Sequence, residues 1–254
     1  MVWDRAGRGR RAPCEHPPRH DGRVPDPNRV TPFGQIEPID QRGLLMGNRG
    51  CLHRQPREIA RPWQVRRWIT CVLEHKGWVA PRWEPGRWTP LFFWDEAVAL
   101  AAGHRPCALC RRPAFTAWID AWEAAFGDRP RVDPMDRRMH ADRVDGRAQR
   151  RHRASWCDLP AGTFVALPPA VTGALAAART GAVPGRAAAH PAVADDVPAL
   201  VLDDRLVPWS VAGYGPPVDR PARGDATVLT PQATVEVVGH GYRPAVHPSA
   251  SPSA

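Results

Sequence analysis

The sequence contains no hydrophobic run of the roughly 18 residues that a membrane-spanning helix needs. Residues 1–30 hold arginines but no apolar segment, which argues against a secretory signal peptide. We therefore predict a cytoplasmic protein with no membrane partner. In that compartment the six cysteines stay reduced, so paired cysteines favour metal binding over a disulfide framework.

Several signatures of enzymes are also missing. The chain has no GxxxxGK[ST] phosphate-binding loop, no GxGxxG dinucleotide fingerprint, no GxSxG nucleophile elbow and no HExxH zinc-protease motif. Nucleotide hydrolysis, Rossmann-type redox chemistry, serine hydrolysis and zincin proteolysis therefore lose their usual sequence support. The sequence leaves open whether the protein catalyses a reaction at all.

Lysine is almost absent, because Lys76 is the only lysine among the 35 basic residues. This bias, with the 30 prolines and many alanines, is typical of a GC-rich genome. The formal charge of +9 is nevertheless typical of proteins that bind DNA or RNA, since arginine neutralises phosphates. Charge alone supports genome composition and nucleic-acid contact about equally.

Composition divides the 254-residue chain into segments and predicts an α+β fold. Residues 1–30 lack apolar periodicity and are expected to form a disordered arm. Residues 42–127 should form a compact metal-binding unit, and residues 128–158 a short helical, basic segment. Residues 159–248 should form a β-rich unit that contains an Ala/Pro-rich insertion at 168–194. The run ATVLTPQATVEVVG near its end also suggests strands.

Local patterns place several elements within the unit at 42–127. Alternating side chains predict a strand over 68–73, and LFFW predicts another. Asp95 is a good N-cap for the helix EAVALAA, and Gly103 is suited to its C-terminal end. A second helix is expected from Pro113 to Gly127.

The pair Cys107-Ala-Leu-Cys110 places two thiols in one tight turn, where they can share a Zn²⁺ ion. Zinc needs two more ligands, and Cys71 together with either Cys51 or His53 would complete a Cys₄ or Cys₃His site. A redox pair and two buried small residues are the alternatives. The redox alternative needs a thioredoxin-like βαβ context, which is missing here.

The segment LFFWDEAVALAAGHRPCALCRR resembles the second half of the N-terminal zinc domain of the adaptive-response (Ada) DNA methyl-phosphotriester repair proteins. The octapeptide MGNRGCLH is similar to the opening of small Ada-like metal-binding domains. The resemblance covers residues 46–112 and implies a zinc-knuckle unit that contacts DNA or RNA, associated with or accessory to repair. It implies as zinc ligands His53, Cys71, Cys107 and Cys110.

The resemblance has one important gap. The methyl-accepting proteins carry a close pair of cysteines in the first half of the domain, and this pair is missing here. We therefore expect a structural zinc site that presents Arg105, Arg111 and Arg112 to phosphate, although these arginines could equally be a solvated rim. A methyl acceptor at zinc-bound Cys71 is the alternative that involves catalysis.

A second candidate site surrounds His140. If this segment is helical, His140 and Asp136 share a face, and Asp142 lies close by in sequence. A metal-dependent hydrolase is one interpretation, and an ordinary charged helix face is the other. A zinc-stabilised protein-interaction module with no nucleic-acid role is a further alternative for the whole chain.

Overall fold

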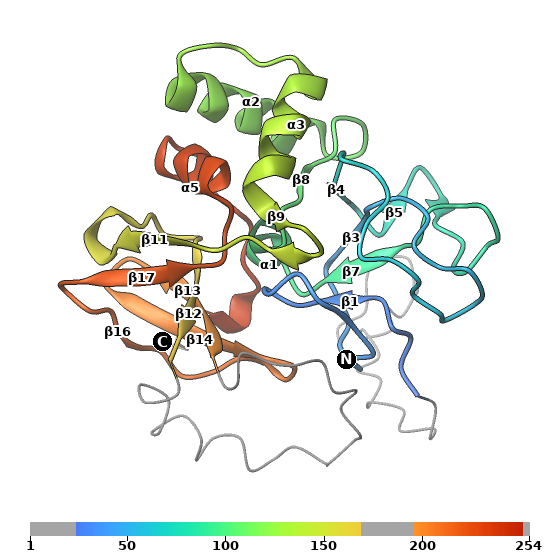
Figure 1. Ribbon diagram of the computed structural model, residues 1–254, viewed down its shortest axis with the longest axis horizontal. Helices are drawn as coiled ribbons and strands as arrows, with labels where there is room; N and C mark the ends of the chain where they lie inside the picture. Colours follow the sequence, from blue (N-terminus) through green and yellow to red (C-terminus); the bar gives the residue numbers. More distant parts are fainter. Residues whose placement is uncertain (1–23, 169–195, 251–254) are drawn as a thin grey trace, which may run out of the picture.

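The computed structural model describes residues 24–168 and 196–250, and these residues contain both helices and several sheets. The predicted α+β class is therefore confirmed. In Figure 1 the first sheet, coloured blue to cyan, lies on one side of the molecule, and the second, yellow to orange, lies on the other. No helix in these two ranges is both long and apolar enough to cross a bilayer.

The first sheet has six strands in the order β2-β1-β7-β3-β4-β8. Strand β1 pairs with β7 and β4 with β8 in parallel, while the other neighbours are antiparallel. Its strands are β1 (Arg29–Val30), β2 (Ile36–Glu37), β3 (Leu45–Asn48), β4 (Ile69–Cys71), β7 (Leu91–Phe93) and β8 (Arg105–Pro106). A hairpin of β5 (Glu74–His75) and β6 (Trp78–Val79) follows β4.

The second sheet has seven strands, in the order β11-β17-β12-β13-β14-β15 with β16 also paired to β14. All of its pairings are antiparallel. Its strands are β11 (His152–Ser155), β12 (Phe164–Leu167), β13 (Val197–Leu202), β14 (Arg205–Ser210), β15 (Gly213–Tyr214), β16 (Val218–Asp219) and β17 (Asp225–Val228). A separate hairpin joins β9 (Val144–Asp145) to β10 (Ala148–Gln149).

Two predicted helices are confirmed. Helix α1 (Glu96–Ala101) begins after Asp95, whose carboxylate accepts the Val98 N–H at 2.9 Å. Helix α2 (Arg112–Phe126) ends at Gly127, which has a φ of +80° in the left-handed region that favours glycine. The other helices within residues 24–168 and 196–250 are α3 (Val132–Arg143), α5 (Gln232–Gly239) and the short 3₁₀ turns η1 (Trp156–Asp158) and η3 (Pro248–Ala250).

Helix α5 corrects a prediction, because the strand signal in ATVEVVG gives way to a helix. Ala233, Val237 and Val238 lie on one helical face and pack against Trp118 of α2 and Met139 of α3. Three helices therefore gather beside the second sheet (Figure 1). Burial of this face outweighs the preference of β-branched residues for strands.

The segment boundaries also differ from those expected. The predicted disordered arm, residues 1–30, includes Arg29 and Val30, yet these two residues form β1 and extend the first sheet because β1 pairs with β2 and with β7. The segment 128–158 holds helix α3, but its last strand, β11, belongs to the second sheet through β17. Residues 1–23 of the predicted arm, and the predicted insertion apart from Pro168, lie outside the described residues.

Helix α1 is buried on every side and joins the two halves of the fold. Its residues contribute to three apolar clusters, one with each sheet and one with α2, α3 and α5. At its start, Asp95 accepts hydrogen bonds from the Tyr214 hydroxyl and the His247 N–H. Glu96 accepts from the Tyr242 hydroxyl and the Ala245 N–H. The C-terminal residues are thereby attached to the helix that precedes the cysteine turn.

Candidate metal centre

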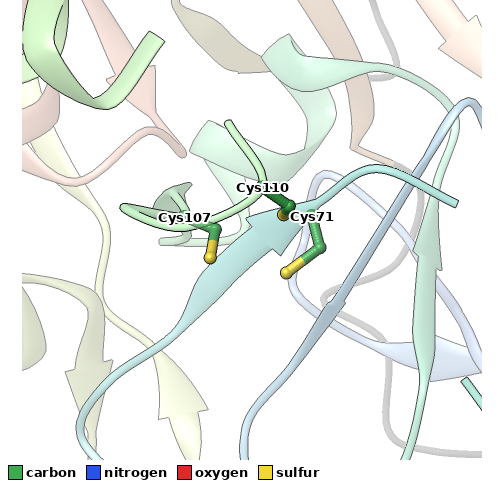
Figure 2. A group of neighbouring side chains, drawn as sticks. All are labelled: Cys71, Cys107 and Cys110. Carbon is green, nitrogen blue, oxygen red and sulfur yellow. The ribbon is translucent and has the colours of Figure 1, made fainter. Parts of the chain in front are cut away.

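Three cysteines meet where strand β4 ends and helix α2 begins. Because β4 and β8 pair in parallel with Thr70 opposite Pro106, the next residues, Cys71 and Cys107, lie side by side. The Cys107 N–H donates to the Thr70 carbonyl at 2.9 Å. Cys110 lies in the turn before α2, and the three Sγ atoms all lie within 4.8 Å of one another. Figure 2 shows the Cys71 and Cys107 side chains pointing into the same space, with Cys110 beside them.

The spacing of the sulfurs suits a single soft metal ion. A tetrahedral zinc ion with Zn–S bonds of about 2.3 Å holds its sulfurs about 3.8 Å apart, so small side-chain rotations would bring the three thiolates onto one ion. The Leu109 N–H donates to the Cys107 Sγ at 3.4 Å, and the Cys110 N–H also donates to it. The Val72 N–H donates to the Cys110 Sγ. These amides favour thiolates, which are the form that binds metal.

The three thiols have different proton affinities. A hydrogen bond from the Cys71 thiol, aided by the Leu109 and Cys110 amides, lowers the pKa of Cys107 to about 5, although burial opposes this. The same hydrogen bond and burial raise the pKa of Cys71. Burial is also the main cause of the raised pKa of Cys110. Cys107 is therefore the thiol that ionises first.

Arg111 fixes the turn that carries the cysteine pair. Its Nη1 donates to the Thr70 Oγ1 and pairs with the Glu96 Oε1, both at 2.8 Å. This one side chain connects the strand of Cys71, the turn of Cys110 and the buried helix α1. The cysteine cluster is thus positioned by the core of the fold.

The structure brings together three of the four predicted ligands and leaves His53 elsewhere. The His53 Nδ1 lies 2.6 Å from the Thr89 Oγ1, and its Nε2 lies 3.2 Å from the Glu84 carbonyl oxygen. Both ring nitrogens are therefore occupied. Cys51, the predicted alternative, has its Sγ 3.7 Å from the His53 carbonyl and is not in the cluster either.

Two of the three arginines expected to contact phosphate are instead internal. Arg105 is 2% exposed and pairs with Asp136 through Nε–Oδ1 and Nη2–Oδ2 distances of 2.8 Å. Arg111 is paired with Glu96, as described above. Only Arg112 lies open to solvent. The sequence carries no signal for the Arg105–Asp136 pair, since tertiary packing of α3 on β8 creates it.

The predicted acid–base group around His140 has different partners. The Arg143 Nη2 lies 3.1 Å from the His140 Nδ1. Trp63 packs edge-on against the imidazole, with the two ring centroids 4.6 Å apart. Asp136 is engaged by Arg105, and the Asp142 Oδ2 accepts the Ala233 N–H at the start of α5. The structure does not assemble these side chains around one reacting position.

A surface depression near the start of β4 was missed by sequence reasoning. It has a volume of about 440 Å³, and two arginine pairs in the sequence, at 66–67 and 137–138, are the signal that could have indicated it. The residues that line it are Asn48, Val65, Arg66, Arg67, Ile69, Asp133, Asp136 and Arg137. Ile69 and Cys71 are two residues apart on β4 and share a face, about 7 Å apart along the strand.

The fold and the cysteine cluster together define an α+β protein with a candidate three-cysteine metal centre. Comparison with protein-family models, with curated proteins and with solved structures finds no match.

Proposed function

We propose that the protein binds one zinc ion through Cys71, Cys107 and Cys110, with a water molecule in the fourth position of the tetrahedron, and that this ion stabilises the fold. The observation that carries the proposal is the meeting of three sulfurs within 4.8 Å. Thiolates are soft ligands that suit zinc, and the backbone amides directed at Cys107 and Cys110 are typical of zinc–cysteine turns.

The ion would connect the end of β4 to the turn before α2. Without metal, the cluster holds thiols whose ionised forms repel one another. Binding zinc replaces this repulsion with metal–ligand bonds that the unfolded chain cannot form in advance, so metal binding adds to folding stability. The proposed role of the site is therefore structural, and the proposal does not depend on a reaction at Cys71.

The test is elemental mass spectrometry of the purified full-length protein, together with its melting temperature. We expect one zinc per chain, lost in Cys107→Ser with a lower melting temperature. Cys157→Ser is the matched control, because Cys157 is exposed and outside the cluster. Equal metal content in Cys107→Ser and Cys157→Ser would reject the site.

The role of His53 has its own variant. Since both of its ring nitrogens are engaged by Thr89 and Glu84, His53→Ala should keep its zinc. Loss of zinc in a folded His53→Ala protein would instead show that His53 is a zinc ligand, as in the Cys₃His set that the Ada-like resemblance implies.

Nucleic-acid contact is the second candidate function. It is favoured by the excess of 35 basic over 26 acidic residues and by the exposed Arg112 directly after the cysteine turn. Fluorescence anisotropy with labelled DNA and RNA oligonucleotides should give affinities that fall steeply with salt. Absence of salt-dependent binding would leave a zinc-stabilised interaction module, and a DNA-repair role would fall with it.

A further inference from the structure

The depression at the start of β4 has more positive than negative charge. Three arginines and two aspartates line it. Both aspartates are already paired, because Arg67 lies 2.7 Å from Asp133 and 3.5 Å from Asp136, and Asp136 also holds the buried Arg105. In the part of the chain that the structure describes, Arg66 and Arg137 form no ion pair with an acidic side chain.

Two buried arginines lie near the residues that line the depression. Trp68 is buried between two guanidinium groups, with the Arg49 Cζ 4.1 Å and the Arg143 Cζ 4.0 Å from its ring. The Arg143 Nη2 donates to the Arg66 carbonyl, so this buried cation reaches the residue that forms the wall of the depression.

Neither buried arginine forms an ion pair with an acidic side chain within the described residues, although Asp136 lies near enough to act on the Arg143 charge. Arg49 donates to the Gly34 and Pro62 carbonyls and to the His104 ring, and Arg143 to the carbonyls of Gly103 and Arg66. The Arg49 Nη2, the Arg143 Nε and the His104 Nδ1 are buried without a hydrogen-bond partner. Carbonyl dipoles thus solvate these charges without cancelling them.

Burial and the arginines also act on the ionisable groups around Trp68. Burial lowers the pKa of Arg49 to about 9, and it is the main cause of the lowered pKa of Arg143. Burial, together with Arg143 and Arg66, lowers the pKa of His140 to about 4. Burial, together with Arg49 and Arg143, lowers the pKa of His104 well below its usual range. The nearby arginines therefore disfavour a further positive charge, while burial, the larger cause of both shifts, disfavours charge of either sign. An anion would accordingly be favoured in the open depression and not beside the buried ring of Trp68.

We propose that this depression is a binding site for a phosphate group. The Arg66 and Arg137 guanidinium groups would pair with its oxygens, while the nearby buried Arg49 and Arg143 add a positive potential. The phosphate could belong to a nucleic-acid backbone, in which case the inference rests on the proposed nucleic-acid contact, or to a free phosphate compound. Both sources present the same tetrahedral anion.

The first arm of the test uses inorganic phosphate. The melting temperature of the zinc-loaded full-length protein is measured in sodium phosphate and in sodium chloride of equal ionic strength. We expect phosphate to stabilise the wild type, and the double variant Arg66→Ala/Arg137→Ala to lose that increment. Arg205→Ala/Arg223→Ala removes two exposed arginines of the second sheet unit and should keep it. If phosphate raises the melting temperature equally in both double variants, or does not raise it in the wild type, the proposed phosphate site is rejected.

The second arm distinguishes the two sources with a labelled single-stranded oligonucleotide. Losing the one backbone phosphate held at this site should reduce the slope of log affinity against log salt by about 0.7. A smaller slope supports a backbone phosphate, whereas an unchanged slope with the first arm positive assigns the site to free phosphate compounds. Zinc content measured in the same variants should stay at the wild-type value, so failure of this site and failure of the zinc proposal give different results.

Discussion

Asp136→Asn tests whether a buried ion pair holds β8, and with it the cysteine turn, against α3. Arg105 and Asp136 have side chains 2% and 4% exposed and form two hydrogen bonds of 2.8 Å. The variant keeps the shape of the side chain but leaves the Arg105 charge buried and uncompensated. Breaking one partner of such a pair costs about 3–5 kcal/mol, which corresponds to a melting temperature about 6–20 °C lower for a domain of this size.

The assay is urea unfolding of the zinc-loaded protein followed by circular dichroism, with Asp120→Asn as the control. Asp120 pairs with Arg129 on the exposed face of α2, where water screens the interaction, so its removal should change stability little. A loss below about 1 kcal/mol in Asp136→Asn would refute the reasoning, because it would mean that the Arg105 charge is solvated in another way.

Three further outcomes follow from other buried contacts. Gly103→Ala should destabilise the protein by about 1–3 kcal/mol in urea unfolding, because Gly103 has a φ of +83° and a Cβ there would lie 2.5 Å from the Arg143 side chain; a neutral result would contradict this packing. The pKa of His140 is about 4 in the folded protein against its usual 6.5, so between these pH values the imidazole binds a proton in the unfolded chain but not in the folded one. The free energy of unfolding should therefore fall as the pH decreases from 6.5 to 4. The fall should be smaller in His140→Asn, and identical pH profiles would exclude His140 as a cause. Tyr242→Phe removes a buried 2.6 Å hydrogen bond to Glu96 and should cost about 1.5–3 kcal/mol by the same assay; wild-type stability would show that this bond contributes nothing.

The elements that local sequence predicts are those with local causes. Helix α1 follows from a capping aspartate and a run of strong helix formers. Helix α2 ends at Gly127, because the residue at that end adopts the left-handed conformation that favours glycine. Cys107 and Cys110 meet because a four-residue turn places them together. Cys71 joins them through parallel strand pairing, which the sequence suggested only as a strand that carries a possible ligand.

The remaining features depend on contacts between distant residues. The valines of α5 favour a strand in isolation and become helical because α2 and α3 bury one face of them. His53 is a residue type that often binds metal, but its two ring nitrogens are hydrogen-bonded to Thr89 and to the Glu84 carbonyl. Arg105 carries the same charge as Arg112, and only the approach of Asp136 makes it internal. Residue type and spacing do not encode these partners.

The carboxylates of Asp95 and Glu96 have a consequence for the order in which the protein matures during synthesis. The three cysteines leave the ribosome well before Tyr242, Ala245 and His247, which supply hydrogen bonds to those carboxylates. Until then, Glu96 is paired with Arg111 but lacks the Tyr242 and Ala245 hydrogen bonds. Asp95 has the Val98 N–H and the Tyr214 hydroxyl but lacks the His247 N–H. The nascent chain can therefore acquire its metal-binding residues early but completes their support only after Tyr242, Ala245 and His247 have been synthesised, and a chain truncated before Tyr242 would expose an unfinished interior to proteolysis.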